Sequence, residues 1–303
     1  MRLFASGALA LLAALALTAC AAVPSGAPTS TAEPTGIVET ARMATVLDDG
    51  TGPQLCLGPI AMSYPPQCGG PAITGWDWAD WTGAYTEASG VRWGAFWVAG
   101  HYDEESDAFT VTDAEPGDEH VWPETEQTAW DFSSPCSAPA GGWAVRDAAL
   151  TTAATLDAAL SYAATSPGYA SAWVDQSPNP LWNTEPATDE GWAEYEAAMN
   201  DPLLTILNVR TSGDVAALET ALQERWGGML CVSAAERSEA ELGVIQEELT
   251  AGALGRPLSA GTDAVSGRVL VDVMVDDGTL QQAADERYGA GLVVVTAALV
   301  PLS

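Results

Sequence analysis

The sequence contains no lysine, and its positive side-chain charge rests on ten arginines against 41 aspartates and glutamates. The formal net charge is −31 at pH 7. A surface of this charge repels phosphate backbones, so nucleic-acid binding is excluded. It also disfavours docking on anionic lipid headgroups. The acidity supports solubility, and it would attract cations or a basic partner.

Residues that serve catalytic and metal sites are scarce. There are two histidines, His101 and His120, and no G-x-S-x-G nucleophile elbow. His101 could pair with Asp103, but both fall in an expected hairpin turn, where surface residues are the better interpretation. Zinc sites need clustered His or Cys. We therefore expect no catalysis, no metal and no cofactor, although a glycosidase pair of carboxylates need not be close in sequence.

The acidic residues are densest between positions 103 and 119, without the spacing of an EF-hand calcium loop. A solvated acidic face is the favoured interpretation, with cation binding left open. The residues concerned are Asp103, Glu104, Glu105, Asp107, Asp113, Glu115, Asp118 and Glu119.

The N-terminus has the pattern of an export signal. A short positive start, Met1-Arg2, precedes an apolar run from Leu3 to Leu17. This run is too short for a confident membrane span. It ends in Leu17-Thr18-Ala19-Cys20, which resembles a lipobox, so residues 1–19 are expected to be a cleaved lipoprotein signal peptide. Cys20 would then be diacylated, and two acyl chains bury enough CH₂ groups for stable anchoring.

Residues 20–36 are rich in Ala, Pro, Ser and Thr and have little to bury, so we expect a disordered tether. The expected location is the cell membrane, with the folded part facing outside.

Four cysteines remain beyond Cys20: Cys56, Cys68, Cys136 and Cys231. An even number outside the cytosol indicates two disulfides, for which three connectivities exist. We favour Cys56–Cys68, which closes a short loop, and this choice leaves Cys136–Cys231.

Residues 37–135 are expected to form a β-rich domain, because short strand patterns alternate with turns. This spacing is typical of a small all-β barrel or sandwich. Trp76, Trp78 and Trp81 could stack on sugars, but alternation places Trp76 and Trp78 on one face of an expected strand. Packing in a core is therefore the favoured interpretation.

Residues 140–303 are expected to form an α+β domain. A long Ala-rich helix is expected over 143–165, and two capping boxes, Ser238–Glu241 and Thr279–Gln282, each predict a helix start. The run Glu224–Val232 matches Glu286–Val294, and each copy lies where a helix ends and a strand begins. Two tandem β-α-β units predict a ferredoxin-like sandwich.

Two resemblances extend this reading. Residues 40–115 resemble a family of uncharacterised actinobacterial exported lipoproteins, and this likeness implies no known activity. Residues 169–250 resemble more weakly the pro-regions of alpha-lytic-type serine proteases, which are small α/β folding assistants and inhibitors. No protease domain follows, so only the fold would carry over. The first likeness rests on Leu55-Cys56-Leu57-Gly58, Tyr64 to Pro71, Gly75 to Trp78 and Gly90 to Gly94, and the second on Ala170 to Asp175 and Ser238 to Leu249.

The sequence thus predicts a membrane-anchored, two-domain recognition protein without catalysis, with an extracytoplasmic protein as its partner. The alternatives are glycan or cell-wall binding through tryptophans and a protease-associated module. We expect the C-terminal domain to hold the partner site, because the edge strands of an open sheet can accept a partner's strand.

Overall fold

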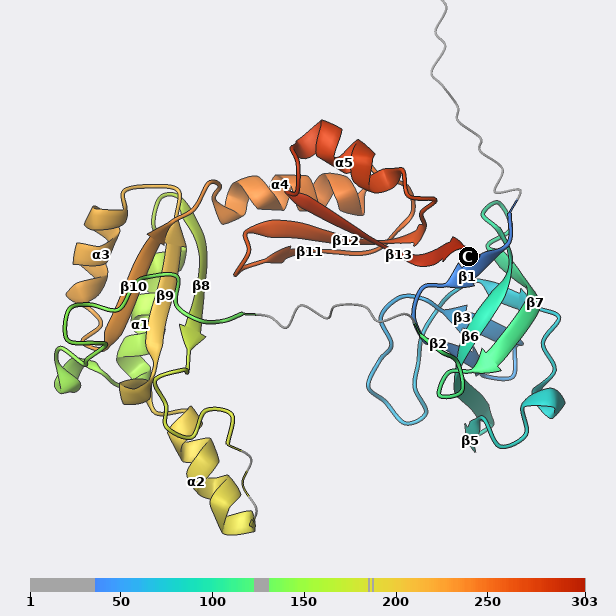
Figure 1. Ribbon diagram of the computed structural model, residues 1–303, viewed down its shortest axis with the longest axis horizontal. Coiled ribbons are helices and arrows are strands. Elements are labelled where there is room, and N and C mark those ends of the chain that lie inside the picture. The colour runs from blue at the N-terminus through green and yellow to red at the C-terminus, as the bar shows by residue number, and fades with distance from the viewer. Residues whose placement is uncertain (1–35, 123–130, 185, 187, 303) are drawn as a thin grey trace, which may run out of the picture. The chain divides into compact units, whose positions relative to one another are not determined.

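The computed structural model describes residues 36–122, 131–184, 186 and 188–302. The expected lipobox at Cys20 and most of the tether lie outside this range. Two β-sheets and five α-helices make up the described part of the chain, which confirms the predicted α+β class (Figure 1). Within it, no helix is long and apolar enough to cross a bilayer.

The first part of the described chain is rich in strands and contains one 3-10 helix, η1. Five of its strands form a closed ring in which β6 pairs with β2, β2 with β3, β3 with β4, β4 with β7, and β7 with β6. Only the β4–β7 pair is parallel. This strand order is that of an OB fold, a five-stranded Greek-key ring. The elements are β1 (Val38–Thr40), β2 (Ala44–Asp48), β3 (Pro53–Cys56), β4 (Ala72–Thr74), η1 (Trp78–Trp81), β5 (Thr86–Ala88), β6 (Val91–Asp103) and β7 (Ala108–Pro116).

The core of this ring follows from alternation along the strands, which sends every second side chain inward. It is filled by buried Val46, Leu55, Phe96, Val98 and Phe109. His101 and Asp103, both expected in a hairpin turn, instead lie on β6, which continues to Asp103, and the tip of the hairpin is at 104–107.

The second part of the chain repeats one plan twice. Each copy has a helix, two antiparallel strands, a second helix and a third strand parallel to the second strand. We call residues 153–234 the first repeat and residues 239–301 the second repeat. The first repeat contains α1 (Ala153–Ala164), β8 (Tyr169–Asp175), α2 (Asp189–Met199), the 3-10 helix η3 (Pro202–Leu204), β9 (Ile206–Thr211), α3 (Val215–Gln223) and β10 (Met229–Ala234). The second contains α4 (Glu239–Thr250), β11 (Pro257–Asp263), β12 (Arg268–Val275), α5 (Leu280–Tyr288) and β13 (Val293–Pro301).

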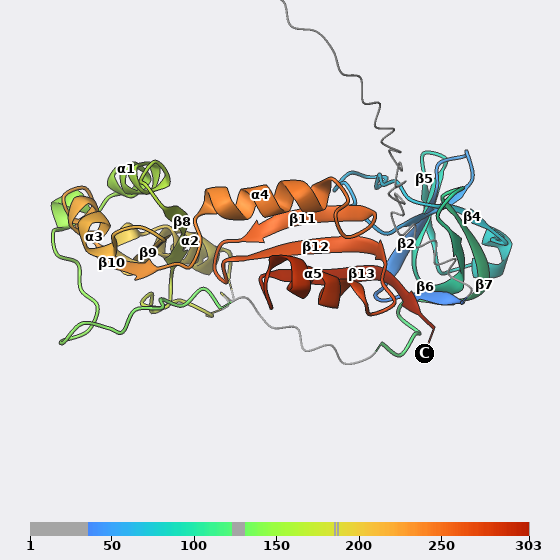
Figure 2. The same ribbon diagram turned by 90° about the horizontal axis from the view of Figure 1, so that it is seen from above.

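In each repeat two helices cover one face of the sheet, α1 and α3 in the first and α4 and α5 in the second. In the first repeat, Leu207 and Val209 of β9 pack with Leu218 and Leu222 of α3. In the second, Val269 and Val271 of β12 pack with the stripe of α4 that includes Leu242. Figure 1 shows α4 and α5 on the same side of β11, β12 and β13, and Figure 2, seen from above, shows both helices lying along these strands.

The two repeats do not form the single ferredoxin-like sheet that the tandem pattern predicted. The first forms its own sheet, in the order β10-β9-β8, whereas the strands of the second continue the larger sheet as β11-β12-β13-β1. The reason is a long-range pairing: β13 binds antiparallel to β1, with Val38 opposite Pro301. Strand pairing therefore crosses the expected boundary between 37–135 and 140–303.

Local expectations also changed. The helix expected over 143–165 is shorter, because α1 starts after Thr152, whose hydroxyl accepts from the Thr155 N–H, and a 3-10 turn, η2 (Ala148–Leu150), precedes it. At α5 the expected capping box is absent: the Thr279 hydroxyl donates to Asp277 instead of capping the helix.

Both disulfides have the predicted connectivity. Cys56 is joined to Cys68 and Cys136 to Cys231, each with Cα atoms 5.8 Å apart. The second bridge ties the segment that precedes the first repeat to β10.

Candidate functional site

The most distinctive site in the described chain is a cavity of about 470 Å³ beside the ends of several strands. We call it the arginine cavity, because Arg210, Arg237 and Arg268 lie along it with a single acidic residue, Glu236. Its size is within the range of small-ligand sites in proteins. It is lined by Ala170, Ser171, Arg210, Ala235, Glu236, Arg237, Leu242, Ser266, Gly267, Arg268 and the stretch from Tyr288 to Leu292.

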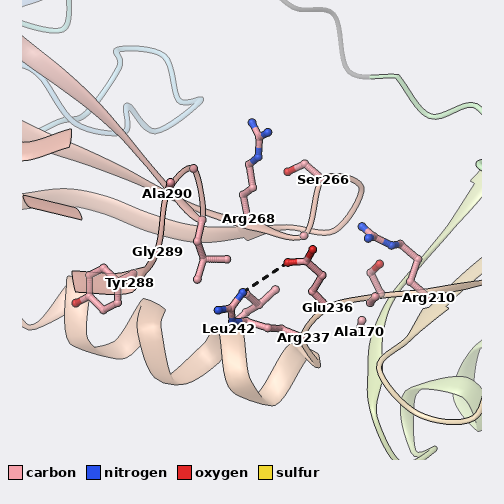
Figure 3. Close-up of a pocket in the computed structure, with 15 residues that line it drawn as sticks. Ala170, Arg210, Glu236, Arg237, Leu242, Ser266, Arg268, Tyr288, Gly289 and Ala290 are labelled. Atoms are coloured by element: carbon pink, nitrogen blue, oxygen red, sulfur yellow. Dashed lines mark ion pairs between the residues drawn. The ribbon is translucent and has the colours of Figure 1, made fainter. Parts of the chain in front are cut away.

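Each arginine comes from a different segment (Figure 3). Arg210 lies near the end of β9, Arg237 lies just before the N-cap of α4, and Arg268 is the first residue of β12. The local folding reason is clear at α4, where Ser238 and Glu241 form the expected capping box and so fix the turn that carries Arg237.

Arg210 is held in place by the β11–β12 turn. Its Nη1 donates to the carbonyl of Val265 at 2.8 Å. Gly267 has a φ of +71°, and a Cβ at this position would lie 3.2 Å from the same Nη1. A side chain here would therefore strain the backbone and crowd the guanidinium, which explains the need for glycine.

The charges of the cavity are unevenly matched. Arg237 and Glu236 form an ion pair at 4.0 Å, which Figure 3 marks with a dashed line. Arg210 donates to a neutral carbonyl, and Arg268 is exposed and forms no ion pair with the described residues. Three guanidinium groups against one carboxylate leave an excess of positive charge in a strongly acidic protein. Guanidinium forks bind carboxylates and phosphates in a bidentate manner.

An unpartnered hydroxyl group adds a second polar feature. Ser171 of β8 lines the arginine cavity and is 6% exposed. Its buried Oγ has no hydrogen-bond partner among the described residues. Ser171 is opposite Arg210 in the β8–β9 register, so the two side chains lie on the same face of the sheet, the one opposite α1 and α3. A buried hydroxyl without a partner is unfavourable, and a bound acceptor would satisfy it.

The rim of the cavity is braced at Tyr288. Its hydroxyl donates to Glu248 Oε2 at 3.1 Å, and Arg287 contacts the same oxygen at 2.7 Å. Burial, followed by the hydrogen bond to Glu248, raises the pKa of Tyr288, so the hydroxyl stays protonated near neutral pH. The hydrogen bond from Arg287 is the main cause that lowers the pKa of Glu248. The ionisable side chains that line the cavity are the three arginines, Glu236 and Tyr288.

The three tryptophans singled out for sugar stacking form part of the ring's core. Trp76 and Trp81 stack at 5.0 Å between ring centroids, and both contact Phe96. Trp78 is 6% exposed, and its Nε1 donates to Asp48. The expected strand through Trp76 and Trp78 was wrong, because Trp78 begins a 3-10 helix capped by Asp77.

The histidines lie apart from the arginine cavity. His101 is exposed on β6. His120 stacks on Trp97 at 4.7 Å and meets Trp122 edge-on, and its Nδ1 lies 2.9 Å from Glu115 Oε2. This contact was not predicted from the sequence. In the acidic run, Asp103 accepts from the backbone of its own turn, and no group of three or more potential ligands in the described chain could hold a metal ion.

The arginine cavity was not predicted from the sequence. A partial signal existed: of ten arginines in a lysine-free chain, Arg210, Arg237 and Arg268 fall close to the starts or ends of strands in the two repeats, as does Arg256, which does not line the cavity. Comparison with models of known protein families finds no match, and comparison with characterised protein sequences finds none either.

Proposed function

We propose that the chain is a lipid-anchored extracytoplasmic recognition protein that binds an anionic group in the arginine cavity without catalysing a reaction. One observation carries the proposal: three of ten arginines, in a chain of formal charge −31, line one cavity with a single carboxylate. The acidic surface as a whole attracts basic partners over long distances. The arginine cavity has the opposite local charge, so it would select a specific anionic group on its ligand.

Anchoring is supported by the lipobox-like run that ends at Cys20 and by the two disulfides, which are typical of exported proteins. Its test is Cys20→Ser, for which we expect loss of lipidation and of membrane fractionation. A variant that matures and fractionates like the wild type would show that the lipobox interpretation is wrong.

Binding is tested by titrating the full-length protein with inorganic phosphate and with acetate, followed by NMR of the arginine side chains. We expect shifts at Arg210, Arg237 and Arg268 that weaken as salt is added. Arg268→Gln is the informative variant, because this side chain is exposed and its replacement breaks no ion pair among the described residues.

Arg92→Gln is the matched control. Arg92 is also a strand arginine with an exposed side chain, but it lies on β6 and pairs with Glu87 at 2.8 Å. Anion binding should fall in Arg268→Gln and be unchanged in Arg92→Gln. An equal effect of both substitutions would mean that anions are attracted by diffuse charge, and the proposed site would then be rejected.

A further inference from the structure

β8 is an edge strand whose first residues lie beside the arginine cavity, while Trp173 and Asp175 near its other end bond to Phe132 and Ser134. In the sheet order β10-β9-β8, β8 pairs with β9 on one side, and no described strand pairs with its other side. Such an edge presents backbone N–H and C=O groups that can accept another extended chain.

A second, smaller cavity of about 60 Å³ continues along this strand. Ala170, Ser171 and Leu242 line both cavities, so the two adjoin. The smaller one is further lined by Tyr169, Ala172, Glu239 and the end of β11 with its turn, Thr262, Asp263 and Ala264. An arginine-rich space thus opens onto an unpaired strand edge.

The strand is irregular where the cavities meet. The β8–β9 register shifts between Tyr169 and Ser171, so Ala170 has no register partner on β9. Bulges of this kind often change the direction of side chains beside binding sites. The unpartnered Ser171 Oγ lies at the same place.

We infer that the anion is the C-terminal carboxylate of an extended peptide, whose backbone lies along the edge of β8 and whose carboxylate enters the arginine cavity. This inference rests on the proposed function and specifies its ligand. Edge-strand addition supplies main-chain hydrogen bonds, and guanidinium groups with the Ser171 hydroxyl supply the donors that a terminal carboxylate requires. Phosphate-bearing alternatives, nucleic acid and anionic membrane surfaces, are opposed by the net charge of −31.

The test uses three short peptides and the full-length protein. The first is acetyl-Ala-Val-Ala-Val with a free carboxylate, the second is the same peptide with an amidated C-terminus, and the third has the free carboxylate but N-methylated backbone amides. We expect the free acid to bind at least about tenfold more tightly than either of the others, since each loses one class of hydrogen bond. Binding of the free acid should weaken in Arg268→Gln and be unchanged in Arg92→Gln, and it should slow amide exchange within Tyr169–Asp175.

The outcomes distinguish a failure of the peptide inference from a failure of the proposed anion binding. Equal binding of acid and amide, with phosphate or acetate still perturbing the cavity arginines, would overturn the peptide and leave anion binding in place. Binding only to vesicles that contain anionic phospholipid would make a lipid headgroup the ligand and overturn the inference. If no anion perturbs Arg210, Arg237 or Arg268, the proposed function fails as well.

Discussion

The two repeats share the order helix, two antiparallel strands, helix and strand, with α2 and η3 inserted between the antiparallel strands of the first, and they use this order differently. At matching helix-to-strand junctions, Trp226 in the first repeat corresponds to Tyr288 in the second. Trp226 is 0% exposed, and its Nε1 donates to the Met229 carbonyl within the core. Tyr288 is half-buried, lines the arginine cavity and bonds Glu248. The same junction thus stabilises a core in one copy and forms the rim of a site in the other.

The strongest test of this contrast replaces each of the two aromatic side chains by alanine. Trp226→Ala should lower the free energy of unfolding by about 4 kcal/mol, because it empties a large buried volume and leaves the Met229 carbonyl unpaired. Tyr288→Ala should lower it by about 1 kcal/mol, because part of that ring already contacts water. Urea denaturation followed by circular dichroism gives both values. Similar losses in the two variants would mean that both junctions contribute equally to the free energy of unfolding, which would contradict the contrast.

The helix starts give a finer comparison. Ser238→Ala should reduce the free energy of unfolding by about 1 kcal/mol, because its Oγ accepts from the Glu241 N–H at 3.3 Å and Glu241 bonds back to the Ser238 N–H. Thr279→Ala, at the start of α5, should cost less than about 0.5 kcal/mol, because its hydroxyl does not cap the helix. The same denaturation experiment decides the order, and a larger loss for Thr279→Ala would contradict the assignment of caps.

The smallest expected effect concerns the ion pair between Arg256 of the second repeat and Asp107 of the β6–β7 hairpin. The first repeat has no equivalent ion pair among the described residues. Arg256 donates to the Asp107 carboxylate through Nη1 at 2.5 Å and Nη2 at 2.9 Å, and its Nη1 also donates to Tyr102 Oη at 2.8 Å. The hydrogen bond from Arg256 is the main cause that lowers the pKa of Asp107, and burial raises the pKa of Tyr102 to about 12. The side chains of Arg256 and Asp107 are 40% and 39% exposed. After allowance for solvent screening, Arg256→Gln should therefore cost about 0.5 kcal/mol at pH 7.

This contact also predicts a pH dependence. Because the pKa of Asp107 is lower in the folded state, its stabilisation is present above the unfolded value of about 4 and is lost as the pH falls through the folded value. Thermal midpoints of wild type and Arg256→Gln should therefore converge below about pH 4. A gap that is constant down to pH 2 would show that the ion pair is not its source.

Features set by neighbouring residues were predictable from the sequence. The Ser238 capping box identified the start of α4, and the repeated junction identified the ends of α3 and α5. The pairing of Cys56 with Cys68 followed from the short loop between them.

Features that depend on pairing between distant strands were not predictable from the sequence. Strand β1 is three residues long and gains its two neighbours, β6 and β13, only from distant parts of the chain. Strand β11 begins with proline and contains glycine, so it lacks the alternation that marks a strand. The arginine cavity was likewise not predictable, since its arginines lie on three segments that only the folded chain brings together.

The pairing of β1 with β13 sets an order of events during folding of a newly made chain. Synthesis proceeds from the N-terminus, so Val38 is available early and Pro301 almost last among the described residues, yet these two lie opposite each other in one sheet. Until β13 is available, β1 lacks one of its neighbours, and the entropy of closing so long a loop slows their meeting. The larger sheet therefore cannot be completed until nearly all of the described chain is present, and an incomplete chain would expose an unpaired strand edge.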